Sequence, residues 1–531
     1  MRLQTMNNDR TAHGPQTHAP RPAWPRALAM FCALGACASP GVPNQRGTPD
    51  AGRRFDVVWR PVRDGTAEVT AIQVTQTLHG VRDSSAFALR APITYAGVRG
   101  IADRVERLAV RDDAGPVPLS SPVDDPPDPG GFPYYRHWRA ERPVRGAVVV
   151  TYRSLVQPPP GGGPPFGIRA AAGGVSGAGS GFLVVPEHQD TVVARVHWDL
   201  SDVAPGSTAV TTFGEGDVEL RAPPEELMQG WIMAGPLGRY PEQGPRRGFS
   251  AAWLGTPAFD VRQEMAWAAG MYDFLAKSYR YLDPAPPYRV FIRVLPSGGR
   301  GATALENSFM LSTGPAAPGA AARAPRATMT HEMGHMWVGG IQGPIGVTSW
   351  FSEGLNTYYT RLLPMRGGFD SVSAYGRSIN TAFRDYYTSR ARNLSADSIV
   401  KIGFNDNEVR HIPYERGSLY FADLDSKLRA ASGGRRNLDS LMQEVFVRRA
   451  RGERFDHAAW IAAVTKELGP SAREQFEAVI LRGETIVPAP DAFGPCFERR
   501  PTTWTFDGGR QVEGFEWVRV PSIPDARCHN W

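Results

Sequence analysis

The stretch ATMTHEMGHMWVGG, residues 327–340, decides what kind of fold the chain must build around it. In a helix, His331 and His335 lie four residues apart and project from one face, with Glu332 at the edge of that face. This is the HExxH pattern, in which two histidines hold Zn²⁺ and the glutamate handles the proton of a water molecule. The structural alternative is a buried helix with two hydrogen-bonded core histidines. The Gly-Gly pair that follows predicts the end of the helix.

A catalytic zinc site needs a third protein ligand and an open position. The best candidate is Glu353, within TSWFSEGLNTYYTRLL, residues 348–363, where Thr348 or Ser349 can cap a second helix. A connection of about nine residues lets the two helices run antiparallel and brings Glu353 over the histidines. The ordinary alternative is a solvated first-turn acid favoured by the helix dipole. Together the three side chains predict a His₂Glu site that is catalytic in form.

The segment from residue 256 to about 490 is predicted to be an α+β domain. The stretch DVRQEMAWAAGMYDFLAKSYRYL, residues 260–282, has helical periodicity, with one face formed by Val261, Met265, Ala268, Met271 and Leu275. A strand, YRVFIRVL at 288–295, follows, and helices dominate the rest of the domain.

Residues 53–255 are predicted to form an antiparallel β-sandwich-like domain. Alternating or β-branched runs bounded by Gly, Pro and Asp indicate its strands: DVVWRPV, AEVTAIQVTQTL, RGAVVVTYRSL, FLVVPE and VVARVHWDL. Two low-complexity segments interrupt them, DDPPDPGGFP at 124–133 and PPPGGGPPFGIRAAAGGVSGAGSG at 158–181. Neither composition suits a packed core, so we expect both to be surface excursions.

Composition and charge exclude several classes of protein. A chain of 531 residues is expected to have two or more domains, and 42% hydrophobic with 21% charged residues is ordinary for a globular protein. The net charge of +6 does not indicate a nucleic-acid partner, because the arginines are scattered and no basic stripe with interleaved aromatic residues is present.

Residues 1–37 are predicted to be an export leader. Arg26 is followed by ALAMFCALGA, which is too short to span a bilayer but long enough for a signal-peptide core, and then by Cys37. The ending LGAC resembles a bacterial lipobox, so we expect a periplasmic protein held in the cell envelope by a lipid on Cys37, with 38–52 as a flexible tether. A disordered leader is the alternative.

Of the four cysteines, Cys32 and Cys37 lie in the leader and the other two lie in a short C-terminal tail, residues 491–531. In an oxidising envelope Cys496 and Cys528 are free to form a disulfide, and two separate buried thiols are the alternative.

The combination of HExxH with a downstream helix carrying E-G-x-x-x-Y-Y resembles the gluzincin zinc metallopeptidases. It is most similar to the glycyl aminopeptidase family, with weaker similarity to the aminopeptidase N family. The resemblance lies in HEMGHMW (331–337), WFSEGLNTYYTRLLPMRGG (350–368), YERGSLYFADLDSKLRAASGGRRNLDSLMQEV (414–445) and, more weakly, GATALENSFMLS (301–312). It covers about 290–450 and implies a thermolysin-like, mostly helical catalytic domain with one Zn²⁺ per chain.

The resemblance also implies roles for individual residues. His331, His335 and Glu353 would be the metal ligands, Glu332 the general base, and Tyr414 the donor to the oxyanion.

For substrate binding, the resemblance suggests Glu306 and Asn307. The carboxylate of Glu306 would clamp the free α-amino group of a peptide, and the Asn307 side chain would hydrogen-bond the peptide backbone.

The sequence therefore favours a zinc aminopeptidase whose partner is a peptide substrate. Two alternatives stay open. One is a zinc endopeptidase of the same fold, and the other is a non-catalytic envelope protein that binds peptides. The sequence predicts neither the side-chain preference nor the oligomeric state.

Overall fold

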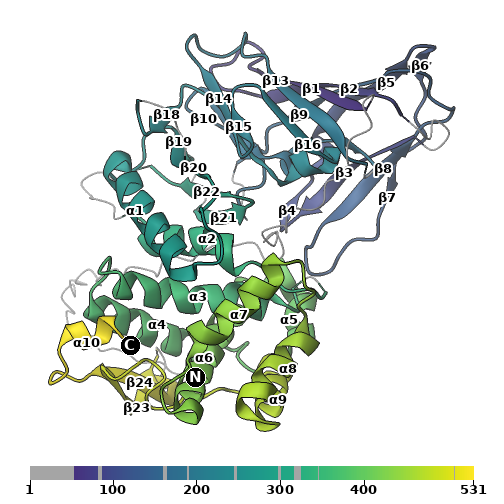
Figure 1. The fold of residues 1–531 in the computed structure, drawn as a ribbon. Coiled ribbons are helices and arrows are strands. Elements are labelled where there is room, and N and C mark those ends of the chain that lie inside the picture. The colour runs from purple at the N-terminus through teal and green to yellow at the C-terminus, as the bar shows by residue number, and fades with distance from the viewer. Residues whose placement is uncertain are drawn as a thin grey trace, which may run out of the picture.

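The computed structural model describes residues 53–531 except 82–86, 160–163, 188–189, 244–247, 297–299, 316–323, 345 and 507–508. The predicted leader and tether, including Cys37, lie outside the described residues. Figure 1 shows the described chain as a β-rich N-terminal part above a mostly helical C-terminal part. This is the predicted fold class. No helix in the described part of the chain has the length and apolar character needed to cross a membrane.

Three sheets form the N-terminal domain. A seven-stranded sheet has the order β16-β13-β1-β2-β9-β5-β6, with β1 Arg54–Val62, β2 Ala71–His79, β5 Val105–Asp112, β6 Gly115–Val117, β9 Val148–Leu155, β13 Val192–Trp198 and β16 Val218–Ala222. Its pairs are antiparallel except that β1 and β13 are parallel, which the prediction did not include. The alternation of buried and partly exposed residues along β1 and β9 is that of strands with one face on a core.

The other two sheets pack with it. One has the order β10-β11-β17-β14-β15, with β10 Arg169–Ala171, β11 Gly174–Ala178, β14 Thr208–Thr211, β15 Gly214–Glu215 and β17 Trp231–Gly235. The other has the order β12-β3-β8-β7, with β4 beside β3, and comprises β3 Ala88–Tyr95, β4 Val98–Arg99, β7 Val123–Asp124, β8 Tyr134–Arg139 and β12 Val185–Pro186. Short 3₁₀ helices are η2 Ala102–Arg104, η3 Gly179–Gly181 and η4 Pro224–Gln229.

The prediction that both low-complexity segments are surface excursions is wrong for 158–181 and holds for only part of 124–133, where Asp124, Pro126, Pro127 and Pro129 are exposed. In the segment 158–181, all five residues of β11 are buried. Its glycines allow backbones to touch, since a Cβ added at Gly177 would lie 2.8 Å from the Cα of Ile168. In the segment 124–133, Gly130, Gly131 and Phe132 are buried. The glycines of these segments allow close packing of the backbone, so a glycine-rich composition does not by itself indicate an exposed loop.

A fourth sheet precedes the helical part of the chain. Its order is β18-β19-β20-β22-β21, with β18 Gly238–Tyr240, β19 Phe249–Leu254, β20 Tyr288–Val294, β21 Gly301–Leu305 and β22 Ser308–Thr313. Strands from both sides of residue 255 pair in this sheet, because β19 lies parallel to β20. The helix predicted at 260–282 is α1, Val261–Tyr279, and Met265, Ala268, Met271 and Leu275 on its predicted face are buried.

Helices make up most of the remaining chain. They are α2 Arg326–Val338, α3 Ser349–Arg366, α4 Val372–Thr388, α5 Ala396–Ile402, η5 Gly403–Asn405, α6 Asn407–Ser432, α7 Leu438–Ala450, α8 His457–Leu468, α9 Ser471–Phe476 and the π-helical turn η6 Glu477–Arg482. Figure 1 shows α2 beside the sheet and α3, α4 and α6 stacked below it.

The C-terminal tail is folded onto α4. It consists of β23 Phe497–Thr505, β24 Gln511–Arg519 and α10 Asp525–His529. The Trp517 ring stacks on Phe383 with centroids 4.1 Å apart, and the Asn380 side chain exchanges two hydrogen bonds with the Trp517 backbone. Cys496 and Cys528 form a disulfide. The tail is therefore an integral part of the helical region.

Helices α3 and α6 approach each other at two glycines. A Cβ added at Gly354 would lie 2.6 Å from the Cα of Gly417, and one added at Gly417 would lie 2.6 Å from the carbonyl oxygen of Trp350. Both contacts are with backbone atoms, which cannot turn aside as a flexible side chain can. The two helices can lie this close only because neither position has a side chain.

We expect Gly417→Ala to lower the free energy of unfolding by about 1–3 kcal/mol, since overpacking of this kind forces backbone shifts. The matched control is Gly270→Ala in α1, where the nearest atom to an added Cβ is 3.7 Å away. That change should be neutral or stabilising by up to about 1 kcal/mol. Chemical denaturation of both variants provides the measurement. Equal effects would show that the close approach of α3 and α6 does not constrain the fold.

Candidate active site

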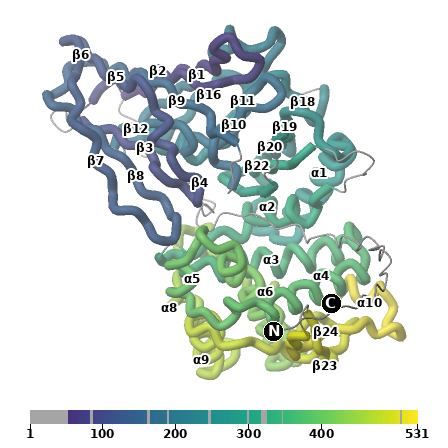
Figure 2. The backbone as a smooth tube through the Cα atoms, turned by 180° about the vertical axis from the view of Figure 1, so that it is seen from behind, coloured from purple at the N-terminus to yellow at the C-terminus, as the bar shows by residue number. Residues whose placement is uncertain are grey.

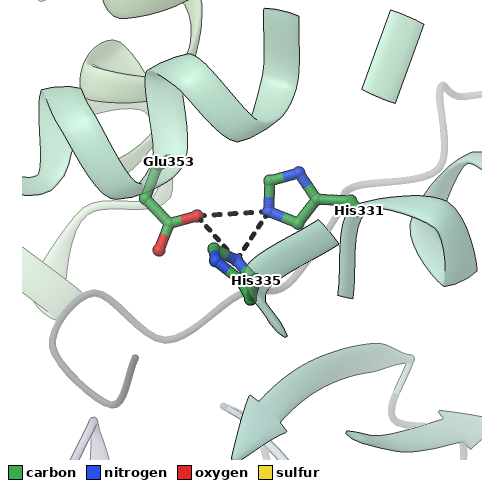
Figure 3. Close-up of side chains that lie close together, drawn as sticks. All are labelled: His331, His335 and Glu353. Atoms are coloured by element: carbon green, nitrogen blue, oxygen red, sulfur yellow. Dashed lines mark hydrogen bonds and ion pairs between the residues drawn. The ribbon is translucent and has the colours of Figure 1, made fainter. Parts of the chain in front are cut away.

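The two histidines of the HExxH motif come from α2 and point to one side of it. Figure 3 shows their imidazoles and the Glu353 carboxylate from α3 turned toward one another. His331 Nε2 is 3.1 Å from Glu353 Oε2 and 3.1 Å from His335 Nε2, and His335 Nε2 is 3.3 Å from the same carboxylate oxygen. All three side chains are buried. The structure thus brings together the three residues predicted as metal ligands.

The spacing of these atoms fits a zinc ion. Tetrahedral Zn²⁺ with bonds of about 2.0–2.1 Å to nitrogen and oxygen requires ligand atoms about 3.3 Å apart. The observed separations of 3.1, 3.1 and 3.3 Å match one face of such a tetrahedron. No other group of three or more His, Cys, Asp or Glu side chains in the described residues converges in this way. Two imidazoles and one carboxylate leave the fourth position open.

Electrostatics keep His331 and Glu353 in the protonation states that bind metal. Burial lowers the pKa of His331 to about 4, although its hydrogen bond to Glu353 acts in the opposite direction. Burial would raise the pKa of Glu353, but its interactions with His335 and His331 outweigh burial and hold the pKa well below its usual range. Near neutral pH, His331 is therefore neutral and Glu353 is ionised, which are the forms that ligate a cation.

The connection between the ligand helices has about the predicted length, but the predicted side-chain cap of α3 is absent. Helix α2 ends at Val338, and Gly339 has a φ of 52° while its N–H donates to the His335 carbonyl at 3.3 Å. Thr348 precedes the first residue of α3, but its side chain makes no capping hydrogen bond. Glu353 lies in the second turn of α3, where it faces α2.

Asn356 and Thr357 lie one turn after Glu353 on α3, and Asn356 contacts the helix that carries the histidines. Its Nδ2 donates to the backbone carbonyl of His331 at 2.7 Å. Helix α2 accommodates it at Gly334, where an added Cβ would lie 2.1 Å from the Asn356 Oδ1 atom. Thr357 lies instead at a neighbouring cavity. The Asn356 amide therefore connects α3 to α2 next to the predicted metal ligands. This hydrogen bond helps to fix the backbone that carries His331.

The predicted catalytic residues lie in the same region. Glu332 is fully buried in α2, and its backbone carbonyl accepts a 3.1 Å hydrogen bond from the Tyr288 hydroxyl. Tyr414, from α6, has its ring centroid 5.8 Å from that of His331 with the planes 22° apart. The structure thus places Tyr414 beside a predicted metal ligand, although the two are far apart in sequence.

A cavity of about 710 Å³ adjoins Tyr414. Helices α3, α4 and α6 line it, and the polar side chains at its wall include Thr360, Arg361, Asp385 and His411. Its size is in the range of sites that hold a small ligand or part of a peptide. These wall residues carry no signal in the sequence, because no local motif joins positions on three different helices.

Glu306 and Asn307 form the two-residue turn between β21 and β22. Asn307 has a left-handed φ of 51°, a conformation that asparagine tolerates better than most residues. Its carbonyl accepts from the Arg289 N–H at 3.0 Å, and the Glu306 carbonyl accepts from the Ser308 hydroxyl at 2.9 Å. The left-handed conformation of the turn is therefore sufficient to explain asparagine at position 307. The substrate-binding roles of Glu306 and Asn307 stay predictions.

The fold is similar to that of solved zinc metallopeptidases. No family model and no curated protein matches the chain in sequence. Among solved structures, the aminopeptidase N family protein from Idiomarina loihiensis aligns with a TM-score of 0.68 at 14% identity, over 86% of this chain and 81% of that one.

Two other solved structures have the same fold. The M1 zinc metallopeptidase from Deinococcus radiodurans, as a variant bound to a Tyr-Ser-Ala substrate, aligns with a TM-score of 0.50 at 19% identity, over 87% of this chain and 99% of that one. Yeast LTA4 hydrolase in complex with bestatin aligns with a TM-score of 0.51 at 14% identity, over 83% of this chain and 69% of that one. At these identities the likeness establishes the fold, and it confirms the predicted resemblance to gluzincin metallopeptidases.

We expect zinc to be retained at mildly acidic pH. A lowered pKa means that protons compete for His331 only as the pH approaches about 4, so one zinc per chain should persist from pH 8 to below pH 6. Metal content after dialysis at a series of pH values measures this. His331→Ala should lack zinc at every pH. Loss of half the zinc near pH 6.5, the ordinary pKa of histidine, would contradict the proposed protonation state.

Proposed function

We propose that this protein is a zinc-dependent metallopeptidase that removes residues from the amino termini of peptides. The observation that carries the proposal is the convergence of His331, His335 and Glu353 at metal-ligand spacing beside Glu332 and Tyr414. This arrangement occurs on the fold that the chain shares with zinc metallopeptidases of known structure. Similarity to the glycyl aminopeptidase family in particular is part of the proposal.

Glu332 is proposed to move the proton. When bound at the three ligands, Zn²⁺ supplies the Lewis acidity that makes water a nucleophile near neutral pH. The Glu332 carboxylate, next to His331 in the same helix, would accept the proton of that water and later deliver it to the leaving nitrogen. A buried setting favours this transfer, because few solvent molecules compete for the proton.

Tyr414 is proposed to donate a hydrogen bond to the oxygen that gains negative charge when the peptide carbonyl is attacked. A phenol is suited to this task because it keeps its proton at neutral pH. Tyr414 is buried and borders both His331 and the cavity. A peptide that extends from the metal ligands into the cavity would therefore pass its hydroxyl.

Glu306 is proposed to select a free amino terminus. A carboxylate that pairs with the α-amino group fixes how far the peptide enters the site, so that cleavage follows the first residue. The alternative is an endopeptidase of the same fold, in which Glu306 makes no such contact. A non-catalytic peptide-binding protein is the second alternative, and the presence of all five metal-site and catalytic residues weighs against it.

The lipobox-like ending of the leader further supports a place in the bacterial envelope, with the protein anchored through Cys37. A Cys37→Ser variant that moves from the membrane fraction to the soluble periplasmic fraction would support this localisation. An unchanged distribution would contradict it.

We expect Glu332→Gln to retain one zinc per chain and to lower kcat by a factor on the order of 10²–10⁴, because it removes the proton acceptor but no metal ligand. Metal analysis and hydrolysis of a panel of aminoacyl amides and short peptides test this. Glu474 is a surface acid on α9 that pairs with Arg482, and Glu474→Gln is the matched control. This substitution should leave both the zinc content and kcat unchanged. Zinc bound by the wild type with no turnover of any substrate would favour the binding protein.

Glu306→Ala should lower kcat/KM for peptides with free amino termini by about tenfold to a hundredfold, as expected for loss of one charge-assisted hydrogen bond. N-acetylated forms of the same peptides should be poor substrates of the wild type and should be unaffected by the substitution. If the wild type cleaves free and acetylated peptides equally well, the endopeptidase alternative is correct.

A further inference from the structure

A loop of the N-terminal β domain reaches the catalytic helices. Figure 2 shows the β7–β8 hairpin extending away from its sheet toward α5, and Figure 1 shows the same approach from the other side. The turn at its end is built on Asp128, whose Oδ1 accepts from the N–H groups of Gly130 at 2.8 Å and Phe132 at 3.2 Å. Both of these bonds are internal to the loop.

The loop is bound to the catalytic domain through its backbone. The Gly130 carbonyl accepts from the Phe404 N–H at 2.8 Å, and the Pro129 carbonyl accepts from Asn405 Nδ2 at 2.6 Å. A Cβ added at Gly130 would lie 2.4 Å from the carbonyl oxygen of Val400, so the close contact requires glycine there. The position of the residue after the two glycines, Phe132, is thereby fixed relative to η5 and α6.

Phe132 is buried against Tyr414. The two form one apolar cluster, with Val400 and Phe404 packed around them, and the Phe132 ring meets the Phe404 ring edge-on at 5.6 Å. Phe132 also reaches the connection between α2 and α3, since a Cβ added at Gly346 would lie 2.9 Å from its Cζ. One side chain of the β domain thus contacts both Tyr414 and the segment that joins the two ligand helices.

The Tyr414 ring is enclosed by other groups as well. The His331 ring lies nearly parallel to it at 5.8 Å, and the His411 ring lies edge-on at 5.6 Å. Phe132 adds a contact from a different domain, which limits the remaining freedom of the ring. A hydrogen-bond donor to a developing oxyanion must be aimed within a fraction of an ångström, and misplacement by about 1 Å can cost on the order of a hundredfold in rate.

From these contacts we propose that Phe132 is a positioning residue for catalysis, through which the N-terminal β domain holds the Tyr414 phenol in line with the reacting carbonyl. The inference rests on the proposed function, because it assumes that Tyr414 is the oxyanion donor. It gives the β domain a role in turnover in addition to any role in stability.

A double-mutant cycle on the full-length, zinc-loaded protein tests this, with kcat and KM measured on one peptide substrate. Phe132→Ala should lower kcat by about tenfold to a hundredfold with KM changed less than about twofold. Phe132→Leu, which keeps most of the apolar volume, should lower kcat by a smaller factor. It replaces the alanine variant in the cycle if that variant does not fold. In the Tyr414→Phe background, which lacks the hydroxyl, either change should lower kcat by less than about twofold.

Phe55→Ala is the matched control for stability. Phe55 is equally buried in the β domain, in β1, and belongs to a different apolar cluster from Tyr414. Its loss should lower the thermal midpoint but leave kcat of the folded protein unchanged. If Phe132 substitutions lower kcat by the same factor with and without the Tyr414 hydroxyl, or do not lower it, the inference is overturned while the proposed function stands. A zinc-loaded wild type that cleaves no peptide overturns the proposed function, and this inference with it.

Discussion

The close packing of α3 against α2 on one side and α6 on the other is the constraint on which the rest of the site depends. Glycine at Gly354 and Gly417 lets α3 and α6 touch, and glycine at Gly334 leaves room for the Asn356 amide between α3 and α2. Since each helix carries a different functional side chain, the distances between these backbones set the distances between the chemical groups. A single added methyl group at one of these positions would shift a metal ligand or the Tyr414 ring.

Burial gives this arrangement its chemical character. Two imidazoles and a carboxylate lie at contact distance away from water, a situation that costs free energy unless a cation compensates the carboxylate. The same burial keeps His331 neutral, so its nitrogen is available to a metal without first losing a proton. The protein therefore spends folding free energy to hold a site that is already arranged for a divalent ion.

The N-terminal and C-terminal halves of the chain share more contacts than two domains that are merely joined in series. Strands on either side of residue 255 share one sheet, and the tip of the β7–β8 hairpin packs on η5 and α6. At the other end, the disulfide-closed tail packs on α4, which also lines the cavity. Elements at both ends of the described chain thus support the helices that surround the candidate site.

The sequence by itself determined what depends on local spacing. His331, Glu332 and His335 lie within one helical turn and a half, and Glu353 follows in the next helix, so a motif and a short connection were enough to predict the set of metal ligands. Strand and helix patterns, together with the family resemblance, predicted the fold class. Tyr414 was predicted only through resemblance to a family. Gly417, the cavity wall and Phe132 were decided by the tertiary structure, and the burial of Phe132 at the end of the segment 124–133 was not predicted. The physical reason is that their roles arise from contacts between segments far apart in the chain. The composition of one segment does not specify which other backbone or side chain will pack against it.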